Sequence, residues 1–223
     1  MKQYATSAPI SVVLDIPAGH IRLVAADRTD TTVEVLPANA AKSRDIKAAE
    51  QTEVSYGDGV LRIETAAAKN RLLGPSGSLD VTVQLPAGSR IEAKAADAEF
   101  RSAGRLGDVT FEGAQGTVRL DETASARLTL LAGDIFLGRL GGPAEISTHK
   151  GDLHITEAVH GTVTLTTQSG DITVGAARKA SATLNAHSAY GRIDNALRNT
   201  DGAAAGLTLH ATTQHGDITA RSL

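Results

Sequence analysis

The chain has 223 residues and a formal net charge of −3 at pH 7, so it lacks the positive field on which unspecific nucleic-acid binding depends. Aromatic residues make up only 3% and cysteine is absent. This composition predicts an aliphatic core and excludes disulfides, thiolate catalysis and cysteine zinc sites. The chain contains no apolar run of about 18 residues, no secretory h-region and no lipidation motif, so we expect no membrane insertion and a cytoplasmic location.

Residues 1–92 are expected to form an irregular, strand-rich capping part. Pro17-Ala18-Gly19 and its second copy, Pro86-Ala87-Gly88, predict tight turns between strands. Residues 40–51 favour a short surface helix with Ile46 as its one large apolar residue, and residues 66–78 favour a loop. Alternating or clustered apolar residues predict strands at residues 11–16, 21–25, 32–36, 52–56, 60–64 and 79–85.

A Gly-Asp phrase followed by alternating apolar residues recurs through the rest of the chain. The copies start about 20 residues apart, and a second alternating segment lies between successive copies. Each repeat therefore predicts two strands joined by a glycine turn. The clear copies are Gly133-Asp134, Gly151-Asp152, Gly170-Asp171 and Gly216-Asp217, and the weaker ones are Ala96-Asp97, Gln115-Gly116 and Gly191-Arg192.

A two-strand repeat has too little apolar surface to fold alone, whereas stacked repeats bury a continuous aliphatic column. We therefore predict an all-β, single-domain parallel β-helix (β-solenoid) with two-strand repeats of about 20 residues. Residues 93–223 are its repeated coils and residues 1–92 its cap. An antiparallel sandwich or barrel is the alternative, although neither requires Gly-Asp at one point of every repeat.

The phrase from Ser169 to Val174, Ser-Gly-Asp-Ile-Thr-Val, occurs together with the Pro17–Gly19 turn. This combination resembles the bacterial DUF4097 family, also called "putative adhesin" domains, and the resemblance covers nearly the whole chain. It implies a parallel β-helix without a defining catalytic motif. The adhesin name also suggests the cell surface, in contrast to the cytoplasmic location expected from the chain itself.

The aspartates of the repeats occupy equivalent turn positions, and Arg192 fills the gap between Asp171 and Asp217 in the sequence. We interpret this set as a structural turn ladder in which each carboxylate accepts hydrogen bonds from backbone N–H groups of its own turn. A bound calcium ion is the alternative, but one carboxylate per repeat is few for an ion that takes six to eight oxygens. The ladder consists of Asp97, Asp134, Asp152, Asp171, Arg192 and Asp217.

We expect no catalytic residue, no cofactor and no metal site. His149, His187 and His215 precede repeat glycines, but a column spread over several coils does not bring zinc ligands together. The alternative is a carbohydrate-active β-helix enzyme, either a lyase or a hydrolase. Its acid/base pair would have to come from His154 and Asp194, which Thr173 separates by one coil in the predicted register.

The function predicted from these features is a non-catalytic, adhesin-like binding or scaffolding surface. Its partner is an unknown protein or glycan, with neither nucleic acid nor membrane insertion expected. The last predicted strand, Gly216 to Leu223, has no evident cap. An uncapped solenoid end exposes unpaired backbone groups, which could pair with the same end of a second copy to form an end-to-end homodimer.

Overall fold

The computed structural model describes residues 1–66 and 77–223, and this part of the chain is all-β apart from one α-helix and one 3-10 helix. The helices are α1 (Ser43–Glu50) and η2 (Gly202–Ala204). The strands are β1 (Lys2–Ala5), β2 (Ser11–Ala26), β3 (Asp30–Pro37), β4 (Thr52–Gly57), β5 (Val60–Thr65), β6 (Leu79–Pro86), β7 (Arg90–Ala103), β8 (Arg105–Ala132), β9 (Ile135–Leu140), β10 (Ala144–Lys150), β11 (Leu153–Ala158), β12 (Gly161–Ser169), β13 (Ile172–Ala176), β14 (Ala182–Tyr190), β15 (Ile193–Ala196), β16 (Leu207–His215) and β17 (Ile218–Ser222).

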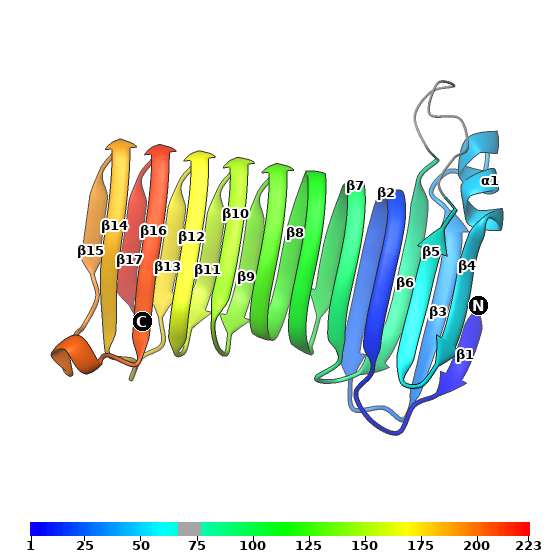
Figure 1. Cartoon of the computed structure of the whole chain (residues 1–223), viewed down its shortest axis with the longest axis horizontal. Helices are drawn as coiled ribbons and strands as arrows, with labels where there is room; N and C mark the ends of the chain where they lie inside the picture. Colours follow the sequence, from blue (N-terminus) through cyan, green and yellow to red (C-terminus); the bar gives the residue numbers. More distant parts are fainter. Residues whose placement is uncertain (67–76) are drawn as a thin grey trace.

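The strands form one 17-stranded sheet that folds over into two facing layers (Figure 1). The first layer runs β4-β5-β2-β7-β8-β10-β12-β16-β14. The second runs β1-β3-β6-β2-β7-β8-β9-β11-β13-β17-β15. Strands β2, β7 and β8 are long enough to contribute to both layers. Among the described strands, the antiparallel pairings are β1–β3, β3–β6 and β4–β5, at the N-terminal end of the sheet. Strands β2 and β7–β17 pair only in parallel.

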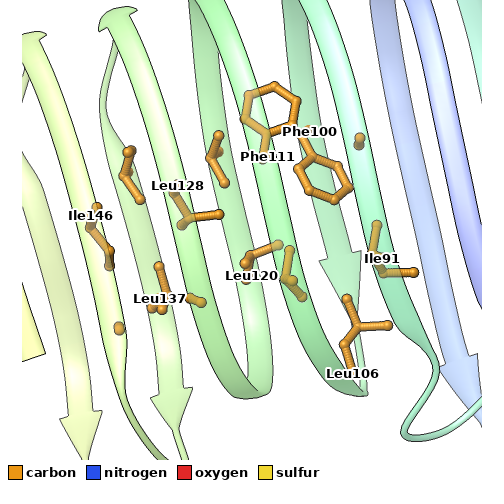
Figure 2. Packing of buried hydrophobic residues seen from close by; sticks show 14 of the residues in the cluster. Ile91, Phe100, Leu106, Phe111, Leu120, Leu128, Leu137 and Ile146 are labelled. Carbon is orange, nitrogen blue, oxygen red and sulfur yellow. The ribbon is translucent and has the colours of Figure 1, made fainter. Parts of the chain in front are cut away.

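The core lies between the layers, because alternate side chains of each strand point inward. Most of these side chains are Val, Ile, Leu and Ala, as composition predicts, but Phe100 and Phe111 are also fully buried, with ring centroids 5.1 Å apart. Figure 2 shows the two rings beside Leu120 and Leu128. A glycine makes room for them, since a Cβ on Gly113 would lie 2.8 Å from Phe111 and 2.9 Å from Leu130.

The residues of all six strands predicted in residues 1–92 are extended, but 11–16 and 21–25 belong to one strand, β2, so the six segments form five strands, and β1 precedes them. The turn predicted at Pro17–Gly19 is wrong, because β2 continues through these residues while it passes from one layer to the other. Helix α1 forms where expected, but it is anchored by buried Asp45 and Ala48 and leaves Ile46 36% exposed. Of the predicted loop at 66–78, residues 67–76 lie outside the described residues.

The two-strand units do not stack in chain order at the C-terminal end. The last unit, β16–β17, inserts between β12–β13 and β14–β15 in both layers. The prediction of an open final strand is therefore wrong, because β17 pairs with β13 on one side and β15 on the other. Burial explains the order: Leu207, Leu209 and Ile218 are at most 1% exposed inside the stack, whereas the polar strand β15 lies at the end.

Candidate functional site

The repeated glycines form a column at the turn between the two strands of each unit. Gly116, Gly133, Gly151, Gly170 and Gly216 have φ values between +127° and +153°. A Cβ on any of them would lie 1.6–2.1 Å from the carbonyl oxygen of the residue stacked below it. No side chain fits at such a distance, so close backbone stacking explains why glycine recurs at this point.

The aspartates that follow these glycines link neighbouring units. Oδ1 of Asp134 accepts a hydrogen bond from the backbone N–H of Asp152 at 2.9 Å, and Asp152 accepts one from Asp171 at 2.8 Å. Asp171 in turn accepts from the N–H of Asp217 at 2.7 Å. The donors thus belong to the adjacent unit rather than to the aspartate's own turn, so each bond bridges two units.

Arg192 lies at the end of this ladder, not between Asp171 and Asp217, because the last unit is inserted before β14–β15. Its backbone N–H donates to Oδ1 of Asp217 at 2.8 Å, and its guanidinium Nη2 lies 3.2 Å from Oδ2. These two bonds, the backbone one first, lower the pKa of the Asp217 carboxyl below its usual value of 3.8.

Asp97 lies outside the ladder. Ala98 is level with Gly116, and Gly116 stacks directly on the Ala98 carbonyl, so Ala98 rather than Ala96 occupies the glycine position. Glu99 consequently takes the place predicted for Asp97, while Asp97 itself pairs with Gln115. The predicted start of this repeat was wrong by two residues because neither Ala96-Asp97 nor Ala98-Glu99 carries the glycine that marks the turn elsewhere.

A second column, of hydroxyl groups that are buried at Thr167 and Thr213 and half-buried at Ser188, was not predicted from the sequence. Oγ1 of Thr167 donates to the Gly151 carbonyl at 3.2 Å and Oγ1 of Thr213 donates to the Gly170 carbonyl at 3.1 Å. Ser188 donates in the same way to Gly216 at 2.9 Å. A signal was present in the sequence, because a Thr or Ser stands three residues before Gly151, Gly170, Gly191 and Gly216.

The ionisable residues considered for metal binding or catalysis do not converge. Within residues 1–66 and 77–223, no group of three or more His, Asp or Glu side chains has the geometry to hold a metal ion. His187 is level with Thr212, whereas His215 is level with Tyr190, so the turn histidines do not share one row. Both β13 and β17 separate His154 from Asp194, one strand more than the sequence register predicted.

The second layer carries a row of basic and aromatic side chains on its outer surface, which we call the arginine row. It consists of Arg22, Arg101, Arg119, Phe136 and His154, one each on β2, β7, β8, β9 and β11, in direct register. Because Ala98 rather than Ala96 is level with Gly116, Arg101 rather than Glu99 lies level with Arg119.

Contacts along the arginine row join its basic and aromatic members. The guanidinium carbon of Arg119 lies 4.3 Å from the centroid of the Phe136 ring, a cation–π contact. The ring centroids of Phe136 and His154 are 6.1 Å apart. All three arginines are exposed, and Phe136 and His154 are half-buried. The row thus combines exposed guanidinium groups with two half-buried rings, of which Phe136 lies between Arg119 and His154.

The acidic side chains beside the row each bond to other protein groups. Glu99 pairs with Arg101, and Asp80 Oδ1 lies 2.6 Å from His20 Nδ1. Asp121 accepts the N–H of Gly104 at 3.0 Å. In the part of the chain that the structure describes, Arg22 and Arg119 have no carboxylate within 4.0 Å.

Two surface depressions among the described residues lie elsewhere. One, of about 370 Å³, is lined by Arg90, Asp108, Ser125 and Glu145 in the first layer. The other, of about 410 Å³, lies between Pro9, Asp27 and Pro86. Neither contains a residue of the arginine row. None of the described helices has the length and apolarity to cross a membrane.

Solved structures share this fold across nearly the whole chain. A "putative adhesin" from Bacteroides fragilis NCTC 9343 superposes with a TM-score of 0.59 at 15% identity, covering 98% of this chain and 95% of that chain. A "putative adhesin" from Parabacteroides distasonis ATCC 8503 gives a TM-score of 0.53 at 14% identity, with the same two coverages, 98% and 95%. Among curated proteins, none matches the sequence. The family model Toastrack DUF4097 matches residues 11–221, and the chain therefore belongs to the Toastrack DUF4097 family.

Proposed function

We propose that the chain is a non-catalytic, adhesin-like module that binds or scaffolds a protein or glycan partner through the arginine row. The observation that carries this proposal is the in-register alignment of three exposed arginines with Phe136 and His154. Arginine and aromatic side chains are enriched at the energetic centres of binding surfaces. The fold neighbours described as "putative adhesins" support a binding role, because adhesion is binding.

We also propose that the two layers form a parallel β-solenoid with two-strand coils of about 20 residues, capped by residues 1–92. The parallel pairing of β9 with β11 and of β11 with β13 in one layer supports it, as does that of β10 with β12 and of β12 with β16 in the other. In this architecture the ladder of Asp134, Asp152, Asp171, Asp217 and Arg192 serves to join coils. Asp97 has no part in it.

The binding role is tested by presenting the purified protein to a glycan array and to a native lysate. The variant Arg22→Gln/Arg119→Gln should lose a partner that the wild type captures. Arg127→Gln is the matched control, since Arg127 is an exposed arginine of the first layer that pairs with Glu145. Capture that is the same for wild type, row variant and control would place the binding surface elsewhere.

A further inference from the structure

Three arginines in register are costly to the isolated protein. Arg22, Arg101 and Arg119 lie on adjacent strands, which are about 4.8 Å apart in a sheet. Like charges directly opposite each other on neighbouring strands destabilise a sheet. The protein compensates one of the three, because Glu99 pairs with Arg101. Of the two outer arginines, Arg119 lies over the Phe136 ring, and neither has a carboxylate partner among the described residues.

The guanidinium groups of the two outer arginines, Arg22 and Arg119, are free to donate hydrogen bonds to an anion. Neither has a carboxylate within 4.0 Å among the described residues, whereas the nearby Glu99, Asp80 and Asp121 bond within the protein. A planar guanidinium donates two parallel hydrogen bonds to a carboxylate, and this is its strongest common interaction. The row therefore presents two carboxylate-binding points that flank Arg101.

The aromatic end of the row suits a ring with an apolar face. Phe136 and His154 are half-buried neighbours on β9 and β11, and Arg119 lies over the Phe136 ring. Together with the arginines they extend across five neighbouring strands, a length of about 19 Å. A nucleic acid fits poorly, because the protein has a net charge of −3 and the row holds a single Phe.

We propose that the arginine row binds an acidic polysaccharide whose carboxylated sugars lie along the row, across the strands. Carboxylates of the polymer pair with Arg22 and Arg119, and one sugar ring packs on Phe136 beside His154. This inference rests on the proposed binding function and names the chemical class of its partner. It also agrees with the position of the row outside the two depressions described above, since an extended polymer needs a row of contacts rather than a pocket.

The test is isothermal titration calorimetry with polygalacturonate, its carboxyl-reduced neutral form, and oligogalacturonates of increasing length. Wild type should bind the acidic polymer, more weakly at higher salt, and affinity should increase with length until the row is filled. Arg22→Gln/Arg119→Gln and Phe136→Ala should each weaken binding by about tenfold or more. Arg127→Gln should bind like wild type, and circular dichroism melts should show all variants folded.

The outcomes separate the ligand class from the binding role. Equal binding of the neutral and acidic polymers, or equal binding by the row variant and Arg127→Gln, would overturn the acidic-polysaccharide proposal. A sulfated polymer bound more tightly than polygalacturonate would show that the row recognises sulfate rather than carboxylate and would also overturn it. If no acidic polymer binds but another partner is captured through the row, the ligand class is wrong and the binding function stands.

Discussion

The two ends of the molecule are finished in different ways. At the N-terminal end, β1, β3 and β4 pair antiparallel to their neighbours, and Tyr4 of β1 meets Tyr56 of β4 with ring centroids 5.2 Å apart. At the C-terminal end, the outermost strands β14 and β15 pair only inward among the described residues. There Tyr190 is 72% and Ile193 47% exposed.

The difference shows that parallel stacking supplies no stop of its own. Each glycine turn presents the next unit with the same surface, so an end must be imposed by a change of strand direction or of composition. At the N-terminal end, the strands change direction. The C-terminal end uses composition, because the apolar unit β16–β17 lies inside and the polar strand β15, with Asp194 and Asn195, lies outside.

The largest expected effect comes from a methyl group in the glycine column. Gly170→Ala places a Cβ 2.0 Å from the Gly151 carbonyl oxygen at a φ of +153°, and should lower the free energy of unfolding by about 4 kcal/mol or more. Gly57→Ala at the N-terminal end is the control, because nothing lies within 4 Å of its added Cβ. Urea unfolding of both proteins measures the difference, and equal losses would contradict the proposed role of the column.

A smaller effect is expected from the buried hydroxyl groups. Thr167→Val removes the bond to the Gly151 carbonyl and should cost about 1 kcal/mol. Thr31→Val at the N-terminal end should lower the free energy of unfolding more, by about 1–3 kcal/mol. This substitution leaves the buried hydroxyl of Thr6 without its hydrogen-bond partner at 2.9 Å. Thermal melts of the two variants measure the order. The reverse order would show that the hydroxyl column holds the C-terminal units more tightly than its bond lengths suggest.

Each end also has a carboxyl group with a lowered pKa. Hydrogen bonds from Arg28, then Gln3, lower the pKa of Asp30, and the backbone N–H of Arg192, then its side chain, lowers that of Asp217. A carboxyl with a lowered folded-state pKa stabilises the protein above its unfolded-state pKa, and this stabilisation is lost as pH falls through the folded-state value. Both contributions should therefore be intact at neutral pH and disappear in strong acid.

The two carboxyl groups should respond differently to loss of their arginine. Arg192→Ala should leave the pKa of Asp217 partly lowered, because the backbone N–H remains. Arg28→Ala should bring the pKa of Asp30 closer to its usual value, since the hydrogen bond from the Arg28 side chain is the main cause of its lowered pKa. NMR titration of the side-chain carboxyl carbons measures both. If the pKa of Asp217 returned fully to its usual value, the Arg192 guanidinium rather than the backbone N–H would be the cause of the lowered pKa.

The effect expected to be smallest for folding concerns the exposed C-terminal end. An end-to-end homodimer stays a prediction, and its contact surface moves from β17 to β14 and β15. Ile193→Lys should abolish any concentration-dependent mass increase in light scattering, with little change in melting temperature, because the side chain is already 47% exposed. Leu36→Lys is the matched control near the other end, at 48% exposure. A monomeric wild type at high concentration would contradict the dimer.

Prediction from the sequence was best where one short-range pattern repeats. Alternating apolar residues located the strands of residues 1–92, and the Gly-Asp phrase located Asp134, Asp152, Asp171 and Asp217 in one ladder. The pattern failed where its marker was missing, at Ala98-Glu99. That two-residue error removed Arg101 from its row and hid the candidate site, since a row across strands exists only in the correct register.

The amino-acid sequence by itself determined the local geometry: which residues extend, which face inward and where a turn requires glycine. These properties depend on period-2 alternation and on the space around single residues. Only the tertiary structure decided the order of the units, with β16–β17 inside β14–β15, and hence the end position of Arg192. Stacking order is set by which unit gains most from burial on both sides, a comparison between segments that no local pattern contains.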